Sequence, residues 1–174
     1  MGGVIIPKTF VVADRPLIFL AGPIRGAPEW QEEAIDFIMS KKPETYVASP
    51  RREVRGNVSR YVLSGMDNHF LRQREWERYY LDVASQNGSI MFWLPGEENH
   101  SCSKSYGAMT RLELGQWMTN YRKDNSLRVV FGSDGKFSEI DTIKYDLSLD
   151  APNKVIYPTL EETCSAALDL AYSP

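Results

Sequence analysis

One carboxylate, Glu113, stands near the start of a predicted helix that follows a predicted buried strand. The strand is the apolar run 89–94, which ends at Pro95 and Gly96. In an open α/β sheet, ligands bind in the crevice beyond the carboxyl ends of the strands, so we expect Glu113 to face a pocket. A carboxylate there serves as a nucleophile toward a sugar carbon, a general base or a hydrogen-bond acceptor. The alternative is a simple electrostatic role at the helix N-terminus.

The elements that must position Glu113 alternate between strands and helices. Apolar runs predict strands over 17–21, 46–49, 89–94, 127–132 and 155–157. Helical periodicity predicts helices over 28–42 and 71–85, one that carries Glu113 to about residue 122, and a last one from 159. This alternation implies a parallel sheet with right-handed crossovers. We therefore expect an α/β three-layer sandwich, flavodoxin-like or Rossmann-like, with a five-stranded parallel sheet and helices on both faces.

The length of 174 residues predicts a single domain over 1–174, with residues 1–16 as an irregular N-terminal lead-in. Two long polar connections, 51–70 and 95–107, have the length of binding loops or lids. The loop 21–26 lacks the Gly-Lys-Ser/Thr of a Walker A sequence and the three glycines of a dinucleotide fingerprint. This weighs against an NTPase and a dehydrogenase.

Composition excludes several classes of partner and cofactor. A hydrophobic content of 43% is ordinary for a globular protein, and the net charge of −3 argues against a nucleic-acid polymer as partner. No apolar stretch is long enough for a transmembrane helix and no secretory leader is evident, so we expect no membrane partner and a cytoplasmic location. The two histidines (69 and 100) and two cysteines (102 and 164) lack a metal-ligand spacing, so no metal site is expected.

Four short segments follow one another at the predicted carboxyl edge of the sheet. They are residues 19–23 (FLAGP), 48–52 (ASPRR), 73–77 (QREWE) and 110–117 (TRLELGQW). Together they resemble the nucleoside 2-deoxyribosyltransferase family, in the branch that has an nPRR loop, a QxxWE helix and an ELG motif. The resemblance covers roughly residues 17 to 130.

The resemblance implies cleavage of the N-glycosidic bond of a 2′-deoxynucleoside and transfer of the deoxyribose to another nucleobase. The Glu of the ELG motif, Glu113, would be the nucleophile that forms a covalent glycosyl ester. A carboxylate nucleophile splits one difficult displacement into two easier ones. The same alignment places the acid that protonates the leaving base at Glu77, where burial would favour the protonated form. The alternative for Glu77 is a solvent-exposed position on a charged helix face.

The resemblance and the residue types also indicate which side chains bind substrate. The Gly22-Pro23 loop is expected to approach the ligand, the two arginines of the nPRR loop to meet an anion or the base edge, and a tryptophan to stack on the base. Many transferases carry an Asp six residues before the nucleophile, where this chain has Gly107, so hydroxyl recognition is expected from Thr110, from Arg111 or from the loop 103–106. The expected substrate-binding residues are Ala21, Gly22, Pro23, Arg51, Arg52, Trp76, Thr110 and Arg111.

The family implies nucleosides and nucleobases as partners, no metal or organic cofactor, and a homo-oligomer with the pocket near the subunit interface. The apolar residues of the Glu113 helix surround much of its circumference, as an interface helix requires: Leu112, Leu114, Trp117 and Met118.

Two other functions stay open. One is a nucleoside or nucleoside 5′-monophosphate N-glycosidase, which would use Glu113 with water as the acceptor. The other is a non-catalytic nucleotide-binding module. A binding module needs only one of the two acids in its pocket, so the presence of both Glu77 and Glu113 favours an enzyme.

Overall fold

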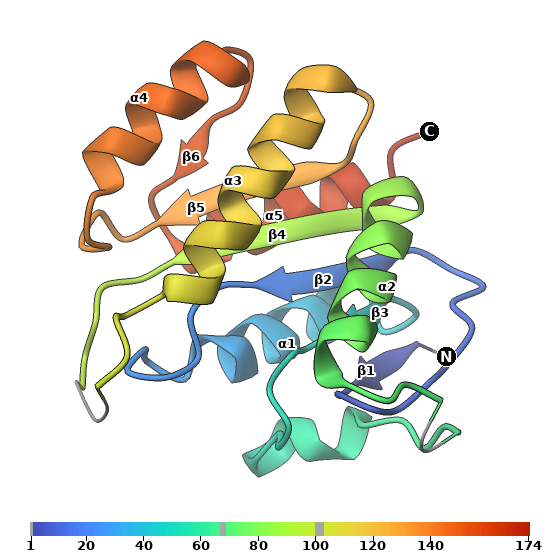
Figure 1. Ribbon diagram of the computed structural model, residues 1–174. Helices are drawn as coiled ribbons and strands as arrows, with labels where there is room; N and C mark the ends of the chain where they lie inside the picture. The colour runs from blue at the N-terminus through green and yellow to red at the C-terminus, as the bar shows by residue number, and fades with distance from the viewer. Residues whose placement is uncertain (1, 67–68, 100–102) are drawn as a thin grey trace.

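The computed structural model describes residues 2–66, 69–99 and 103–174 (Figure 1). Within them, one parallel sheet has the strand order β1-β3-β2-β4-β5-β6. Its strands are β1 (Gly3–Ile5), β2 (Leu17–Ala21), β3 (Tyr46–Ala48), β4 (Gly88–Leu94), β5 (Val129–Ser133) and β6 (Ile156–Tyr157). The helices are α1 (Trp30–Lys41), the 3₁₀ helix η1 (Gly56–Tyr61), α2 (Gln73–Gln86), α3 (Ala108–Lys123), α4 (Ile140–Asp150) and α5 (Leu160–Ala171). His100 and Cys102 lie outside the described residues.

The predicted α/β sandwich with a parallel sheet is confirmed, but the sheet has six strands rather than five. The additional strand is β1, which lies in the segment predicted to be an irregular lead-in. Its three residues pair with β3, Gly3 opposite Tyr46 and Ile5 opposite Ala48. A strand of three residues is too short to show the two-residue period of a strand in its own sequence. The lead-in is also fixed at Val11, whose backbone exchanges hydrogen bonds of 2.8 and 3.0 Å with the Tyr80 hydroxyl.

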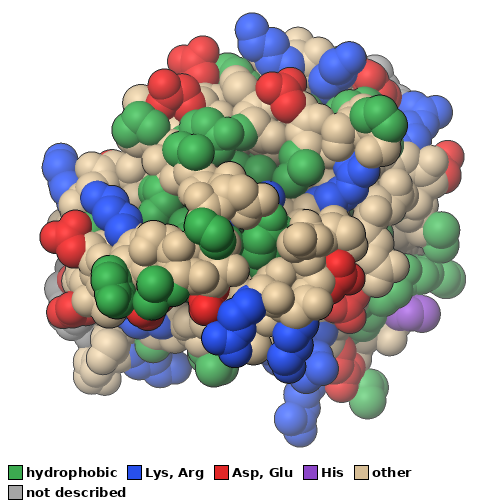
Figure 2. Space-filling model, turned by 90° about the horizontal axis from the view of Figure 1, so that it is seen from above, with side chains coloured by type: hydrophobic (Ala, Val, Ile, Leu, Met, Phe, Trp, Pro, Cys, Tyr) green, Lys and Arg blue, Asp and Glu red, His purple; other side chains and the backbone are tan. Residues whose placement is uncertain are grey.

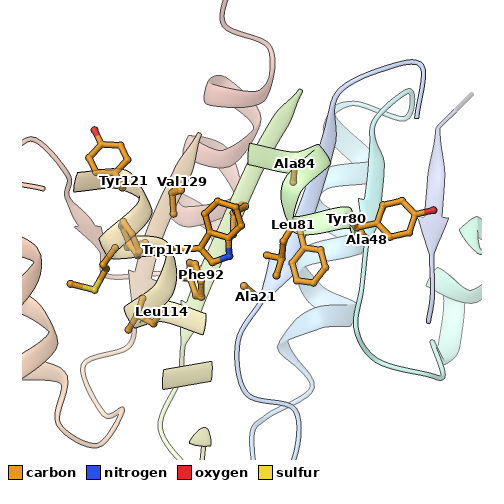
Figure 3. Close-up of a cluster of buried hydrophobic side chains, with 14 of the residues drawn as sticks. Ala21, Ala48, Tyr80, Leu81, Ala84, Phe92, Leu114, Trp117, Tyr121 and Val129 are labelled. Atoms are coloured by element: carbon orange, nitrogen blue, oxygen red, sulfur yellow. The ribbon is translucent and has the colours of Figure 1, made fainter. Parts of the chain in front are cut away.

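The helices cover both faces of the sheet. Figure 1 shows α2, α3 and α4 in front of the strands and α1 and α5 behind them. Two hydrophobic clusters match this division, one against α2, α3 and α4 and the other against α1 and α5. In the first cluster, Leu114 and Trp117 of α3 point toward the strands that carry Ala21 and Phe92 (Figure 3).

The chain reverses its direction across the sheet between β2 and β4. From β2 it passes through α1 to β3 on one side, and from β3 it returns through α2 to β4 on the other side of β2. Because α1 and α2 lie on opposite faces, the loops that leave β2 and β4 diverge and open a crevice at the carboxyl ends of these strands. The fold therefore predisposes this edge to bind a ligand.

The apolar residues of α3 predicted to form an interface serve this chain's own core. Leu114, Trp117 and Met118 are buried against the sheet, and only Leu112 of that set is exposed. The pattern was therefore wrong as evidence for an interface helix, because core packing accounts for it. The surface seen from above mixes hydrophobic side chains with charged ones of both signs (Figure 2). Each helix that the structure describes is too short or too polar for a membrane span.

The helix α5 packs so closely on β5 that residue 132 has no space for a side chain. A Cβ atom at this residue would lie 2.9 Å from the Cβ of Thr163, whose side chain is fully buried and already donates to the Thr159 carbonyl. Gly132→Ala is expected to lower the free energy of unfolding by about 1–3 kcal/mol, since the helix must move outward. Gly115→Ala is the control: this glycine is exposed in the middle of α3, and a Cβ there has no neighbour within 4 Å. The control should gain about 0.5–1 kcal/mol. Urea denaturation measures both, and a Gly132 variant as stable as the wild type would contradict the packing argument.

Candidate active site

A cavity of about 600 Å³ lies at the carboxyl edge of the sheet. Its walls come from the loop after β2 (22–26), the connection after β3, the first turns of α2, the loop after β4, and the start of α3 (104–110 with Glu113). These are the segments that the reversal between β2 and β4 brings together. The volume falls within the range of pockets for small organic ligands and cofactors.

Two carboxylates face this cavity from different helices. Glu113 of α3 is buried, with 11% of its side chain exposed, and Glu77 of α2 is half-buried, with 17% exposed. The structure thus brings together the two acids that the sequence analysis selected. Glu77 is not on a solvated helix face, which was the alternative for it.

A single guanidinium connects the two acids. Nη1 of Arg74 donates to Glu77 Oε2 at 3.2 Å and makes a closer contact with Glu113 Oε1. Arg74 lies one turn before Glu77 on α2 and 39 residues before Glu113. Its bonds therefore join α2 to α3 through the two acids.

The other oxygen of Glu77 is also held. Gln73 donates from Nε2 to Glu77 Oε1 at 3.0 Å and to the Pro50 carbonyl at 3.0 Å. The Gln73 Oε1 atom accepts from Nε of Arg52 at 2.9 Å. Glu77 is thereby oriented from two sides, by Arg74 and by a network that reaches the connection after β3.

Burial dominates the electrostatics of Glu113. Desolvation raises the pKa of the Glu113 carboxyl, the charge and hydrogen bond of Arg74 oppose this increase, and the charge of Glu77 adds to it. The resulting pKa is above its ordinary value. Burial alone would lower the pKa of Arg74, but its contacts with Glu113 and Glu77 outweigh burial and raise it. Arg74 therefore stays charged and favours the ionised form of the acid beside it.

The loop after β2 enters the cavity wall with Gly22 and Pro23. The Pro23 carbonyl accepts hydrogen bonds from Trp30 Nε1 at 2.9 Å and Gln31 Nε2 at 3.2 Å, so α1 fixes the loop. A Cβ at residue 22 would lie 2.7 Å from the Trp30 ring and even closer to the Trp93 carbonyl. Glycine is needed here because loop, helix and strand meet without space for a side chain.

Three of the predicted substrate-binding residues lie outside the cavity wall. Ala21 is buried in the core at the end of β2. Trp76 is fully buried, and its Nε1 donates to the Thr9 carbonyl at 3.0 Å, so its ring is not available to a base. Arg111 donates to the Ser138 carbonyl and hydroxyl at 3.1 and 2.8 Å, and it lies over the Phe137 ring. The predicted substrate contacts of these three residues are corrected accordingly.

Helix geometry explains these corrections. Successive residues of an α-helix point about 100° apart, so only one member of an adjacent pair faces a given site. Glu77 faces the cavity, and its neighbour Trp76 therefore faces the sheet. Thr110 lies in the cavity wall and is buried, whereas its neighbour Arg111 reaches the segment before α4.

Both arginines of the nPRR loop line the cavity. Arg51 forms an ion pair with Glu29 at 2.8 Å, and the hydrogen bond of Arg52 goes to the neutral Gln73. Two further residues of the site were not predicted: Arg25 in the wall and the bridging Arg74. Tyr106, at the end of the loop expected to recognise sugar hydroxyls, lines the cavity, and its hydroxyl donates to the Pro95 carbonyl at 2.8 Å. The i, i+3 spacing of Arg74 and Glu77 predicts an ion pair between these two residues, but it does not predict the contact of Arg74 with Glu113.

Gly107, which stands where many transferases carry Asp, has a structural role. It precedes α3 in the left-handed conformation, with φ of 63°, and a Cβ there would lie 2.9 Å from the Phe137 ring. A carboxylate at this position would need both strain and a shift of Phe137. Thr110 is the nearby predicted residue that keeps a place in the wall.

Comparison with protein-family models, with curated proteins and with solved structures finds no match for this chain. Among the residues that the structure describes, no cluster of three or more His, Cys, Asp or Glu side chains is arranged to hold a metal ion. The chemistry that the described site offers is that of two carboxylates and one shared guanidinium.

The raised pKa of Glu113 predicts that this residue costs stability at neutral pH. Its folded pKa exceeds the ordinary 4.5, so the folded state binds the proton more tightly and loses relative stability as pH rises through the folded pKa. Glu113→Gln does not titrate and is expected to be more stable than the wild type at pH 7, by about 1 kcal/mol. The difference in free energy of unfolding between the variant and the wild type should decrease as the pH falls toward 4. Urea denaturation across this range measures it, with Glu33→Gln on an exposed site of α1 as control. A Glu113→Gln variant less stable than the wild type at pH 7 would contradict the assignment.

Proposed function

We propose that the protein is a nucleoside 2-deoxyribosyltransferase that forms a covalent glycosyl intermediate on Glu113. The observation that carries the proposal is the pair of carboxylates, Glu113 and Glu77, held by one nitrogen at the wall of a cavity of about 600 Å³. A donor deoxynucleoside would place its anomeric carbon against Glu113 and its base near Glu77. The resemblance in the four segments supports the same assignment.

The reaction proceeds in two half-reactions. Glu113 attacks the anomeric carbon as the bond to the base breaks, and Glu77 donates a proton to the leaving base. The incoming base then gives a proton to Glu77 and attacks the same carbon, which releases Glu113. The configuration at this carbon is inverted twice and is therefore retained.

The spacing of the acids supports a double displacement. Both bind one nitrogen atom, so the two bound oxygens lie no further apart than two hydrogen-bond lengths, about 6 Å. Retaining glycosidases hold their carboxyl groups about 5–5.5 Å apart, whereas inverting enzymes separate them by about 6.5–9.5 Å to admit a water molecule. The arrangement here favours the retaining geometry.

An N-glycosidase specific for nucleoside 5′-monophosphates is the second candidate. Arg25 and Arg52 line the cavity, and the described residues offer neither of them a carboxylate partner. Guanidinium groups that are not paired with a carboxylate can bind a phosphate through charge-assisted hydrogen bonds. The hydrolase would use the same Glu113, with water in place of the incoming base. A non-catalytic binding module has less support, since it needs no second acid.

The homo-oligomer that the resemblance implies also remains a proposal. Its support is the exposed apolar surface of α3 beside the cavity, where Met109 belongs to the wall and Leu112 lies one turn away. A neighbouring subunit that covers these side chains would narrow the mouth of the cavity.

Purified protein incubated with 2′-deoxyinosine or thymidine, with and without adenine, tests the proposed transfer. Chromatography is expected to show a new deoxynucleoside only when adenine is present. Glu113→Ala should abolish its formation, because no carboxylate remains to accept the sugar. Gln116→Ala, an exposed position on the same helix, should leave the rate unchanged. Free base released equally in both incubations would favour the hydrolase, with monophosphates tested next, and an active Glu113→Ala variant would refute the nucleophile.

Glu77→Gln removes the proton donor while keeping a similar shape. Base exchange is expected to slow by about 10²-fold or more, the usual contribution of a general acid. A fluorinated or nitrated leaving base of low pKa should recover much of the first half-reaction, since it departs without protonation. Asp82→Asn, at an exposed carboxylate further along α2, is the matched control. An unchanged rate in Glu77→Gln would exclude its role as the acid.

A further inference from the structure

Arg74 joins α2 to α3 through the two acids of the site. Its side chain is about one third exposed, and its Nη1 atom is shared between Glu77 on its own helix and Glu113 on α3. It is not part of the cavity wall, although both of its partners are.

The two half-reactions of the proposed function require opposite charge states of the acids. Before transfer, Glu113 must be ionised and Glu77 protonated. After transfer, Glu113 is an uncharged ester and Glu77 must be ionised to accept a proton. Either way, the pair carries one negative charge, and that charge moves from one acid to the other. A single cation in contact with both acids can stabilise it in each state.

We propose that Arg74 is a positioning residue that pairs with ionised Glu113 before glycosyl transfer and with ionised Glu77 after it. This inference rests on the proposed function of the site. The geometry that carries it is the one nitrogen that contacts both carboxylates, with Glu113 as its closer partner.

The proton and electron balance is complete within these residues and the substrates. In the first half-reaction, an electron pair of Glu113 forms the bond to the anomeric carbon, the electron pair of the glycosidic bond goes to the base nitrogen, and the proton of Glu77 follows it. In the second, the incoming nitrogen forms the bond, Glu113 regains its electron pair, and Glu77 takes up the proton. Arg74 exchanges no proton in either step.

Removing Arg74 has a predictable effect on Glu113. Among the described residues, the charged groups that act on the Glu113 carboxyl are Arg74 and Glu77, both from α2. Without Arg74, burial and the negative charge of Glu77 both favour the protonated form. Glu113 would then lose its proton only at higher pH, and the nucleophile would be absent at pH values where the wild type has it.

Arg74→Gln tests this in two measurements, with Arg74→Lys and Arg78→Gln for comparison. Arg78 is an exposed residue one turn further along α2, and its replacement removes the same charge. The first measurement is a pH titration of the Glu113 side-chain carboxyl by ¹³C NMR, assigned with Glu113→Gln, which needs no activity. The second is the pH profile of kcat/KM with 2′-deoxyinosine and adenine, together with the mass of the intact protein during turnover.

Arg74→Gln is expected to titrate Glu113 at higher pH and to lose about tenfold in kcat/KM on the acidic limb. Arg74→Lys should restore part of both effects, and Arg78→Gln should match the wild type.

Superimposable NMR titrations of Glu113 in the wild type and Arg74→Gln would overturn the inference, as would equal pH profiles in an active wild type. If Arg74→Gln does not fold, Arg74→Lys takes its place: a single ammonium group on a shorter side chain contacts the two carboxylates less well, so a smaller upward shift of the Glu113 titration supports the inference and a titration identical to the wild type overturns it. A wild type that forms neither a new deoxynucleoside nor a sugar adduct refutes the proposed function, while the NMR titration still reports on Arg74.

Discussion

The site depends on the burial of one carboxylate. Glu113 is placed at the sheet edge by the α3 helix, where most of its hydration is lost, and such burial is unfavourable unless a positive charge is close. Arg74 supplies that charge from the neighbouring helix α2. The ion pair offsets part of the cost of burial, because the pKa of Glu113 stays above its ordinary value. It fixes the relative placement of two helices and, through Glu77, defines the acid wall of the cavity.

The strands were predictable wherever their burial is complete. The runs at 17–21 and 89–94 are apolar throughout because both of their faces are covered, which is what a central parallel strand requires. β1 was missed because three residues carry no period, and its partner β3 is 41 residues away in the chain. α4 was not predicted for another reason. Only Ile140 and Leu147 of its eleven residues are buried, so its sequence lacks the apolar periodicity that indicates a helix.

For the site, the sequence indicated the elements correctly but not always the side chains. Motif order placed Glu77, Glu113 and the Gly22-Pro23 loop at one edge, and the cavity contains all of them. Trp76 and Arg111 were assigned to the same edge because each adjoins a residue that faces it, and one step along a helix turns a side chain away. From the sequence, Arg74 belongs to the charged segment 74–78, which is typical of a solvent-exposed helix face. Its bond to Glu113 joins residues 39 apart, and only the packed structure shows that contact.

The arrangement of the acids has a consequence for the choice between transfer and hydrolysis. Two carboxylates on one nitrogen are closer together than the acids of inverting hydrolases, which are about 6.5–9.5 Å apart to admit a water molecule. A hydrolase built on this site would therefore also pass through an ester of Glu113, and water would enter only in the second half-reaction. Whether a base or water arrives there depends on how well the cavity excludes solvent while the ester exists. Exclusion of solvent depends on the cavity walls that the connections after β3 and β4 contribute. The acid pair can activate either acceptor, a base or water.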